Sequence, residues 1–537
     1  MKPTLPNNES WSPQTREAST ISLWDANQRR KPSRKDVLNQ LKEGRDKEEE
    51  SDPSIVVRDG RTDHKAKGWA GLHRDHSTHA RERRVPIRSV SSTLIALRTK
   101  AVEAKKHRFR HLYSAINLEM LYESFGRLRA QATAGIDGVC YADYAENLAA
   151  NLEALLDRLK RKCYRAPSVR RVYIPKGEGK TRPLGIPTIE DKIVQQAVSM
   201  ILESIYEADF SDQSKGYRRG QDGARETSRL LRDELQEGRY RYAVEADIKS
   251  FFDEMDHDWL CRMLEQRIDD RAFINLIRKW LKAGVLDPQT GQTEATTQGT
   301  PQGGVISPVL ANIYLHYVLD IWIEWIAQKK MQGKVYFLRY ADDIIVIFEN
   351  RREAQRYLRA LPHRLAKFNL RLAEEKSGLV KFNQWEHTSS GVFTFLGFDY
   401  YLGRATRNRN WPVVKRRTNK KKFRAAIRAY KEWIKKARNW PLKMILSSLR
   451  KKLRGYWNYY GVQSNQKMNS RYFRAVTRLT FHWLNKRSQR KSYTWKKFLD
   501  HWYNDWDIPT PRVVEGFTDF RKRREQLEMP LAKGMQS

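Results

Sequence analysis

The feature that most constrains the fold is the segment VYFLRYADDIIVIFEN, residues 335–350, in which two adjacent aspartates separate two apolar runs. Runs rich in Val, Ile, Tyr and Phe favour β-strands, and a short polar break between two such runs predicts a β-hairpin. Asp342 and Asp343 would then lie at the hairpin tip, beside side chains that we expect to be buried. Aspartate is common in ordinary β-turns, but a carboxylate in apolar surroundings is costly unless a partner compensates its charge.

A third aspartate has comparable neighbours. The segment RYAVEADIKSFFDEMDHDWL, residues 241–260, begins with a pattern typical of a buried strand and becomes helical after Phe252. Asp247 stands at the end of this strand. Carboxylate oxygens are preferred ligands of Mg²⁺, and two such ions about 3.5–4 Å apart can activate an attacking hydroxyl and stabilise the leaving oxygen. If the fold brings the three aspartates together, they predict a metal-dependent nucleotidyl transfer site.

The charge of the chain indicates a polyanionic partner. Among 537 residues, 102 Lys and Arg oppose 63 Asp and Glu, which gives a formal net charge of +39. Basic side chains neutralise phosphates and release condensed counterions, so this excess favours DNA, RNA or an anionic membrane surface. No window contains about 18 uncharged apolar residues, so we expect no membrane-spanning helix. With 40% hydrophobic residues the chain can bury a core, which excludes a fully disordered polymer.

The cysteines and the amino terminus bear on the cellular compartment. Cys140, Cys163 and Cys261 are widely spaced and too few for a four-cysteine zinc ribbon, and they favour a reducing environment. The amino terminus lacks the apolar core of a secretory signal, and Glu9 and Glu17 argue against an organellar transit peptide. We therefore expect a cytoplasmic protein, of bacterial or similar origin, that associates with nucleic acid.

The pattern changes along the chain. Residues 1–90 are polar and predict a mobile extension, or alternatively a segment that becomes ordered on RNA. Leucines spaced by four, three and four positions over residues 148–159 predict a helix with one apolar stripe. Residues 170–187 predict a strand, a glycine-rich turn and a second strand, and residues 189–206 predict a helix.

A basic region begins near residue 412. From Lys415 to Arg454 there are 17 Lys and Arg and one acidic residue, which predicts a phosphate-binding surface rather than salt-bridge decoration. An apolar stripe predicts that this surface is carried by a helix, and its members are Phe423, Ile427, Tyr430 and Ile434. The residues predicted to bind nucleic acid are Lys415, Arg416, Arg417, Lys420, Lys421, Lys422, Arg424, Arg428, Lys451, Lys452 and Arg454. We expect Trp457, Tyr459 and Tyr460 to pack in a core rather than stack on bases.

Several motifs resemble those of reverse transcriptases, especially the proteins encoded by group II introns. YADD (340–343) resembles the catalytic hairpin of that family, EADIKSFFDEMDH (245–257) its first catalytic strand, and TPQGGVISPVLANIYLHYVLD (300–320) its nucleotide-pocket loop and the helix that follows. Further matches are GIDGV (135–139), KGEGKTRPLGIPTIEDKIVQQA (176–197), KGYRRG (215–220), LAEEKSGLVKF (372–382), FLGF (395–398), LRGYWNYYGVQSN (453–465) and WLNKRSQRKSYTW (483–495). The resemblance extends from about residue 93 to about residue 510, with the motifs in the family's order.

The resemblance implies an α/β right-hand polymerase. Fingers and palm would occupy residues 91–400, and an all-helical thumb and maturase domain would occupy residues 401–510. Residues 511–537 would form a short tail, without the paired cysteines or His-rich cluster of an endonuclease domain and too short for a separate DNA-binding domain. The implied reaction is extension of a DNA primer on an RNA template with dNTPs.

The resemblance also implies roles around the three aspartates. Asp247 and Asp342 would hold two Mg²⁺ ions, and Asp343 would support them. Lys376 would assist the departure of pyrophosphate.

A nucleotide pocket is implied next to these residues. Lys176 and Arg182 on the fingers hairpin would grip the triphosphate, to which Arg can make a planar bidentate contact. Gln302 and Gly303 would line the pocket, where glycine permits close approach of the backbone. Phe252 would be the steric gate that excludes a sugar 2′-hydroxyl, unless it is an ordinary core residue.

The implied partners are group II intron RNA, a template–primer, a target DNA and dNTPs, with splicing assisted by stabilisation of the active RNA fold. Two other functions remain open. A splicing-only maturase is disfavoured by the presence of Asp247, Asp342 and Asp343, whereas the sequence does not exclude a free-standing reverse transcriptase that serves host defence or DNA repair. An RNA-dependent RNA polymerase is disfavoured by Phe252. The sequence assigns neither a particular intron RNA nor an oligomeric state.

Overall fold

The computed structural model describes residues 90–177, 180–288, 290–294, 296–300, 303–383, 390–405, 411–487 and 492–515, and leaves out the side chains of residues 175–177 and 180. Every described residue belongs to one unit, Pro86–Ser537. The predicted extension therefore lies outside the described residues, apart from Val90.

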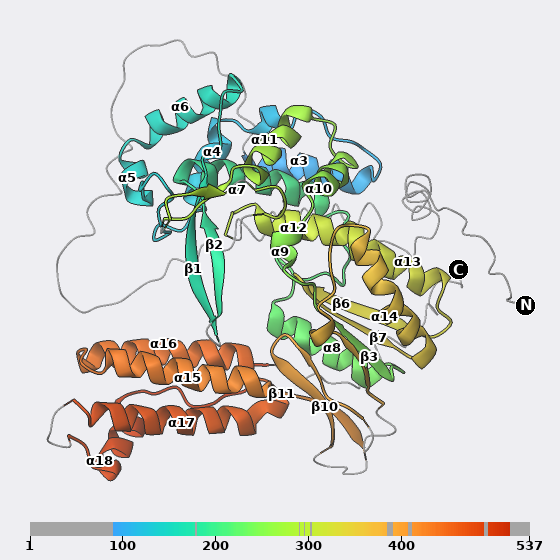
Figure 1. Ribbon diagram of the computed structural model, residues 1–537. Coiled ribbons are helices and arrows are strands. Elements are labelled where there is room, and N and C mark those ends of the chain that lie inside the picture. The colour runs from blue at the N-terminus through green and yellow to red at the C-terminus, as the bar shows by residue number, and fades with distance from the viewer. Residues whose placement is uncertain are drawn as a thin grey trace, which may run out of the picture. The chain divides into compact units, whose positions relative to one another are not determined.

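Helices form the amino-terminal part of this unit (Figure 1). They are α3 (Val90–Glu103), α4 (Leu118–Gly126), α5 (Tyr141–Glu146), α6 (Leu148–Lys160), α7 (Ile189–Tyr206), α10 (His257–Glu265) and α11 (Arg271–Leu281). Nearly all residues of α7 are buried, and this helix packs against α3 and α4. α7 covers the predicted range, and α6 carries the predicted stripe with Leu152, Leu155 and Leu159 buried, so both predictions are confirmed.

A long hairpin extends from these helices (Figure 1). Its strands β1 (Val169–Gly177) and β2 (Lys180–Ile186) pair antiparallel, which confirms the predicted strand, turn and strand. β1 also pairs with β4 (Val285–Leu286), which pairs with β5 (Thr293–Glu294), so the sheet order is β2-β1-β4-β5. We call β1 and β2 the fingers hairpin.

The palm contains an antiparallel sheet of order β6-β7-β3-β8. Its strands are β6 (Val335–Tyr340), β7 (Asp343–Phe348), β3 (Tyr242–Ala246) and β8 (Gly378–Lys381), and the helices next to it are α8 (Ala224–Glu237), α12 (Ser307–Leu315), α13 (Ile321–Lys329) and α14 (Arg351–Ala366). Ile344 and Val346 enter the core that includes α14, whereas Ile345 and Ile347 enter a second core that includes α8. Because both faces of β7 are covered, its apolar run is continuous instead of alternating.

The carboxyl-terminal part consists of a small sheet and a helical thumb. The sheet has the order β11-β10-β9, with β9 (Phe393–Phe395), β10 (Phe398–Arg404) and β11 (Pro412–Thr418). Three long helices follow, and they lie side by side in Figure 1: α15 (Lys420–Ala437), α16 (Leu442–Tyr460) and α17 (Gln466–Leu484); the shorter α18 (Trp495–Asp500) comes after them. They share a core that contains Tyr430, Ile434 and Trp457, as the apolar stripe predicts.

The predicted start of the helical domain is displaced. Residue 401 falls inside β10, and the helices begin only at Lys420, because Pro412–Thr418 pairs with β10 along its whole length. Val414 and Thr418 of this strand are buried, and so is Arg416. None of the described helices combines the length and apolar character that a membrane span requires.

Candidate catalytic site and nucleotide pocket

The three predicted aspartates lie at one end of the palm sheet. Tyr340 pairs with Asp343, so Ala341 and Asp342 form a two-residue turn between β6 and β7. On the other side of β7, β3 runs antiparallel, and its last residue, Ala246, lies opposite Ile344. Continuing this register by one residue places Asp247 beside Asp343, because cross-strand partners change by one position at a time. The structure thus brings together carboxylates that are about a hundred positions apart in the sequence.

The charges at this end of the sheet affect one another. The pKa of Asp343 is raised to about 6. The main cause is that neighbouring protein atoms limit the hydration of its carboxyl, and the second cause is that the negative charges of Asp342 and Asp247 disfavour a further negative charge. Lys422 of α15 and Lys376 act in the opposite direction. A divalent cation would relieve this repulsion, and carboxylate oxygens are suitable ligands for Mg²⁺.

Asp247 is fixed by the segment that precedes β8. Its backbone N–H donates to Ser377 Oγ at 3.1 Å, and its carbonyl accepts from the Ala373 N–H at 2.8 Å. Lys376 Nζ lies 2.5 Å from Asp247 Oδ2, and this hydrogen bond is the main reason why the pKa of Lys376 is raised. Within the described ranges, no three His, Cys, Asp or Glu side chains are already grouped as metal ligands. A cation at Asp247 would therefore compete with the Lys376 ammonium, and the role of the aspartates as ligands stays a prediction.

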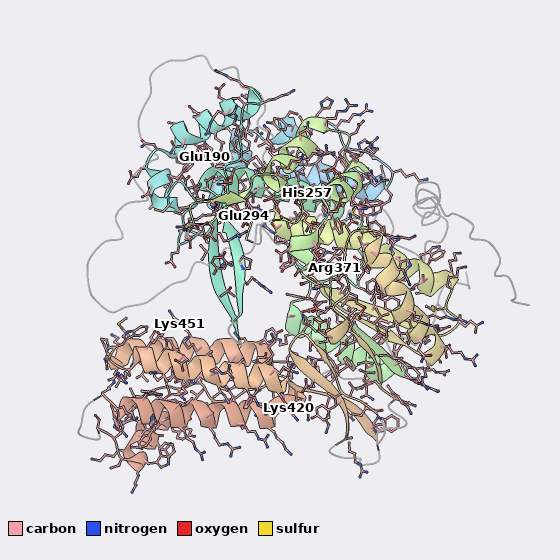
Figure 2. The ribbon with its side chains drawn as sticks, in the orientation of Figure 1. Glu190, His257, Glu294, Arg371, Lys420 and Lys451 are labelled. Carbon is pink, nitrogen blue, oxygen red and sulfur yellow. The ribbon has the colours of Figure 1, made fainter. Side chains whose placement is uncertain are left out.

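A pocket lies between the fingers hairpin and Phe252 of α9 (Phe251–Glu254). Its lining includes Tyr173, Pro183, Leu184, Gly185, Val285, Gln298 and Thr300. Glu294, which Figure 2 labels, pairs with Arg171 of β1 at 2.9 Å, and both residues also line the pocket. Phe252 is half-buried, so part of its ring is available to the pocket.

Two glycines allow the loop after the pocket to approach its neighbours. Gly299 has a φ of 81°, and a Cβ there would lie 2.8 Å from the carbonyl oxygen of Phe252. Gly303 has a φ of 116°, and a Cβ there would lie 2.8 Å from the carbonyl oxygen of Gly185 in β2. A larger residue at either position would displace backbone. His257 Nε2 lies 2.6 Å from the Gly299 oxygen and ties this loop to α10 (Figure 2).

The remaining predicted pocket residues are only partly described. Gln302 and the side chain of Lys176 lie outside the described residues. Arg182 is exposed on β2, opposite Ile174 of β1.

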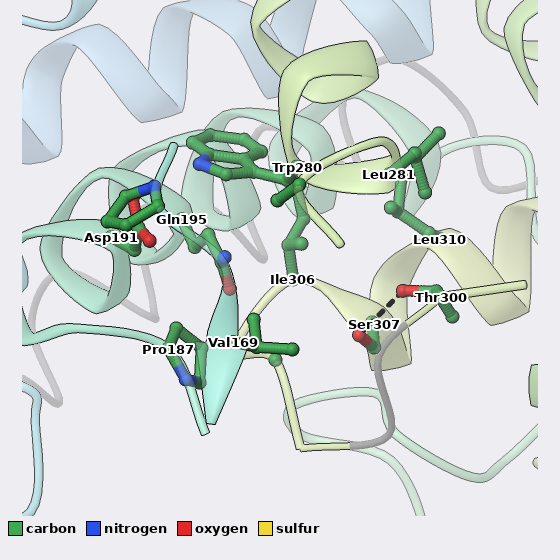
Figure 3. Close-up of a pocket in the computed structure, with 13 residues that line it drawn as sticks. Val169, Pro187, Asp191, Gln195, Trp280, Leu281, Thr300, Ile306, Ser307 and Leu310 are labelled. Carbon is green, nitrogen blue, oxygen red and sulfur yellow. Dashed lines mark hydrogen bonds between the residues drawn. The ribbon is translucent and has the colours of Figure 1, made fainter. Parts of the chain in front are cut away.

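A second, smaller cavity lies behind the same loop (Figure 3). Thr300 Oγ1 and Ser307 Oγ are 2.9 Å apart at one side of it, and Gln195 of α7 accepts a hydrogen bond from the Val305 N–H at 2.9 Å. Asp191 of α7 also lines the cavity, and burial raises the pKa of this carboxyl to about 7. These contacts fix the loop of the nucleotide pocket to α7, whose residues are nearly all buried.

Tyr217, for which the sequence predicts no role, lies near both halves of the site. It belongs to the motif KGYRRG, has a φ of 60° and is 48% exposed. The pKa of its hydroxyl is raised by partial burial and then by Asp342, whereas Arg182 lowers it. The phenol is therefore within electrostatic reach of the hairpin tip and of the fingers arginine. The motif was recognisable in the sequence, but the exposure of one tyrosine within it was not.

The predicted nucleic-acid-binding residues separate into two groups. The exposed group, which we call the thumb basic surface, comprises Lys420, Lys421, Lys422, Arg424 and Arg428 of α15 and Lys451, Lys452 and Arg454 of α16. Figure 2 labels Lys420 and Lys451 of this group. Lys415 is half-buried, and its Nζ donates to the Arg404 carbonyl at 2.7 Å. Arg417 is half-buried as well, and it pairs with Asp399 at 3.5 Å.

Arg416 does not belong to this surface, contrary to the prediction. Its side chain is completely buried, donates to Ser228 Oγ at 2.7 Å and pairs with Glu515. A buried guanidinium whose charge is already neutralised by a carboxylate cannot also contact an RNA phosphate, so Arg416 joins structural elements instead.

Comparison with known proteins agrees with this geometry. Residues 174–400 match the family model described as reverse transcriptase (RNA-dependent DNA polymerase), a range that contains the palm sheet, β2 and the end of β1 from Ile174 onward. The chain is 37% identical over 242 residues to Protein YkfC of Escherichia coli strain K12, covering 40% of this chain and 63% of that protein. It is 31% identical over 396 residues to Group II intron-encoded protein LtrA of Lactococcus lactis subsp. cremoris, covering 58% of this chain and 64% of that protein.

A third relative is the uncharacterized 91 kDa protein in cob intron of Schizosaccharomyces pombe, which is 39% identical over 174 residues, 32% of this chain and 21% of that protein. The chain spans somewhat less than two thirds of the length of the first two relatives. The matched range includes the aspartates at 247, 342 and 343 and all residues that line the first pocket except Arg171 and Tyr173. Residues 174–400 therefore match the reverse transcriptase family, and the chain is similar to a group II intron-encoded protein.

Proposed function

We propose that this chain is an RNA-directed DNA polymerase that extends a DNA primer on an RNA template with dNTPs. The observation that carries the proposal is the convergence of Asp247, Asp342 and Asp343 at one end of the palm sheet. This end of the sheet is linked to a glycine-bordered pocket, since the segment that follows Asp247 leads directly into α9, whose Phe252 lines the pocket.

Two Mg²⁺ ions, held mainly by Asp247 and Asp342, would supply the Lewis acidity that activates the primer 3′-hydroxyl and neutralises charge on the transferred phosphate. Asp343 would support this arrangement, since its carboxyl already responds to the charges of the other two. Lys376 forms an ion pair with Asp247. A cation bound to Asp247 would displace the Lys376 ammonium, which could then donate a proton to the departing pyrophosphate.

The nucleotide would be positioned by residues of the fingers and of the pocket. Arg182 is exposed and available for a bidentate contact with the triphosphate, and Lys176 would assist it. Gly303 would allow the base or sugar to approach the backbone, and Gln302 would contact it from the same loop. The half-buried ring of Phe252 would exclude a 2′-hydroxyl by its bulk.

The thumb basic surface would bind phosphates of the template–primer and of a group II intron RNA. Eight exposed basic side chains on two adjacent helices supply the charge that such binding requires. The splicing role needs no further chemistry, because binding alone would stabilise the active fold of the RNA. Target DNA would bind to the same basic surface during intron mobility.

The test of the polymerase proposal is Asp342→Ala. We expect this change to abolish dNTP incorporation in a primer-extension assay while RNA affinity changes by less than about twofold, because only a metal ligand is lost. Asp258→Ala, at an exposed aspartate of α10, is the matched control and should retain wild-type extension. Normal extension by Asp342→Ala would reject the assignment of the site.

A further inference from the structure

A buried arginine donates a hydrogen bond to the backbone of the turn that carries Asp342. Arg339 belongs to β6, lies two residues before Ala341 and is completely buried. Its Nη1 donates to the carbonyl oxygen of Ala341 at 3.0 Å and to Asn312 Oδ1 of α12 at 3.0 Å. The carbonyl that it binds belongs to the peptide unit immediately before Asp342, so this hydrogen bond fixes the plane from which the Asp342 side chain projects.

The guanidinium is itself locked in place. Asp320 accepts from Arg339 Nε at 2.7 Å and from Nη2 at 2.6 Å, a planar bidentate pair in which both side chains are buried. Asp320 ends η3 (His316–Asp320), a π-helical turn between α12 and α13, and such turns change which face of a helix a side chain occupies. The pair therefore anchors the hairpin to the helices beneath the palm sheet.

A second close contact to the turn is made by Gly216. Gly216 packs so closely against the turn that a Cβ on it would lie 2.3 Å from the backbone nitrogen of Ala341. Asn312 Nδ2 donates to the Gly216 carbonyl at 2.8 Å, so the same asparagine connects both supports. The N–H of Lys215 donates to the Arg339 carbonyl at 2.8 Å and thus continues the contact along β6.

The turn needs such support because its backbone is strained. Ala341 has a φ of 58°, and a residue with a Cβ avoids this left-handed region unless the surrounding structure enforces it. If the support were removed, the Ala341–Asp342 peptide would be free to rotate toward a more favourable conformation. The Asp342 carboxylate would then turn away from Asp247 and Asp343.

We propose that Arg339, locked by Asp320 and Asn312, is a positioning residue that sets the orientation of the Asp342 carboxylate for binding of divalent cations. The proposal rests on the polymerase function proposed above. Arg339 acts through the peptide that carries Asp342, because its Nη1 donates to the Ala341 carbonyl oxygen of that peptide.

The experiment compares Arg339→Lys with the wild type in primer extension over a titration of Mg²⁺. Lysine retains the charge that pairs with Asp320, but its ammonium cannot reproduce the planar fork that also reaches Ala341 and Asn312. We expect kcat to fall by about a hundredfold, as for a displacement of about 1 Å at a reacting centre. The Mg²⁺ concentration for half-maximal activity should rise about tenfold, which corresponds to a tenfold loss of affinity for the cation. The KM for dNTP should stay within about twofold, since the pocket is unchanged.

Gly216→Ala perturbs the turn independently, because it leaves the Arg339–Asp320 pair intact and pushes on the Ala341 backbone. It should give the same combination of lower kcat, higher Mg²⁺ requirement and unchanged KM. The matched control is Arg267→Lys. Arg267 is also buried, pairs with Asp209 at 2.9 Å and donates to the Ala104 carbonyl at 3.1 Å, so its contacts lie away from the β6–β7 hairpin. Arg267→Lys should lose about as much thermal stability as Arg339→Lys, while its kcat and Mg²⁺ requirement remain those of the wild type.

The outcomes separate the two proposals. A wild-type Mg²⁺ requirement in folded Arg339→Lys and in Gly216→Ala would overturn the positioning role, and so would an equal shift in Arg267→Lys. If Arg339→Lys does not fold, Gly216→Ala alone decides. Absence of dNTP incorporation by the wild-type protein would instead reject the polymerase proposal.

Discussion

Phosphate binding by α15 can be tested through the salt dependence of nucleic-acid affinity. Lys420, Lys421, Arg424 and Arg428 are exposed, and at about 100° per residue they fall within one sector of about 100° on the helix surface. We choose these four for replacement by Gln. Lys422 is left in place because it also lowers the pKa of Asp343, so that its loss would mix binding with catalysis.

The expected magnitude follows from the number of contacts removed. Each phosphate contact contributes about 0.9 to the slope of log K against log salt on a duplex, so four lost contacts should reduce the slope by about 3.6. Between about 50 and 200 mM salt, these four contacts account for a change in affinity of about 150-fold. The assay is fluorescence anisotropy of a labelled RNA template with a DNA primer, titrated at several KCl concentrations.

A matched variant separates local contacts from net charge. Arg351, Arg352, Arg356 and Arg359 are also exposed, but they lie on α14, whose buried face packs against the palm sheet. Their replacement by Gln lowers the net charge by the same four units and should change the slope by less than about one. The reasoning is refuted if the α15 variant keeps the wild-type slope, or if both variants lose the same amount.

Two further predictions concern the pocket loop and the RNA partner. Because the pKa of Asp191 is about 7 in the folded chain against an ordinary 3.8, the folded state holds the proton more tightly, and stability should fall as pH rises from about 4 to about 7. Asp191→Asn should remove this loss, which amounts to at most about 4 kcal/mol at pH 8, with about 2.6 kcal/mol of it falling between pH 5 and pH 8. Urea unfolding at these two pH values measures that part, and an unchanged pH dependence would contradict the assignment. Sequencing of the RNA that copurifies with the protein should recover one structured intron, whereas a mixture of cellular RNAs would favour a free-standing reverse transcriptase.

Local patterns in the sequence were sufficient for the main elements. The two apolar runs around Asp342 and Asp343 predict β6, the tight turn and β7, and the leucine stripe predicts α6. Hydrophobic periodicity and turn propensity depend on a few consecutive residues, so they can be recognised from the sequence without knowledge of the fold. The same is true of the basic, amphipathic character of α15, whose stripe residues Tyr430 and Ile434 are indeed buried.

Boundaries and pairings were less accessible. The strand β11 lies within a basic region that predicts helices, and it is a strand because β10 offers a partner along its length. Likewise, the local propensities near Asp247 do not indicate that it stands beside Asp343. The family resemblance implied a shared site, and the register of β3 against β7 sets the position of Asp247.

What the sequence by itself determined was therefore the kind of chemistry, through three acids at strand ends, and the approximate order of the parts. Tertiary structure alone decided what each basic residue does. Arg416 and Arg417 are adjacent in one charged run, yet the first is buried against Glu515, 99 positions away, while the second remains half-exposed. Arg339 is likewise assigned by Asp320 and Asn312, which belong to other elements. Arg416 and Arg339 can be buried because distant segments supply their counter-charges and hydrogen bonds, and the local sequence pattern does not identify those segments.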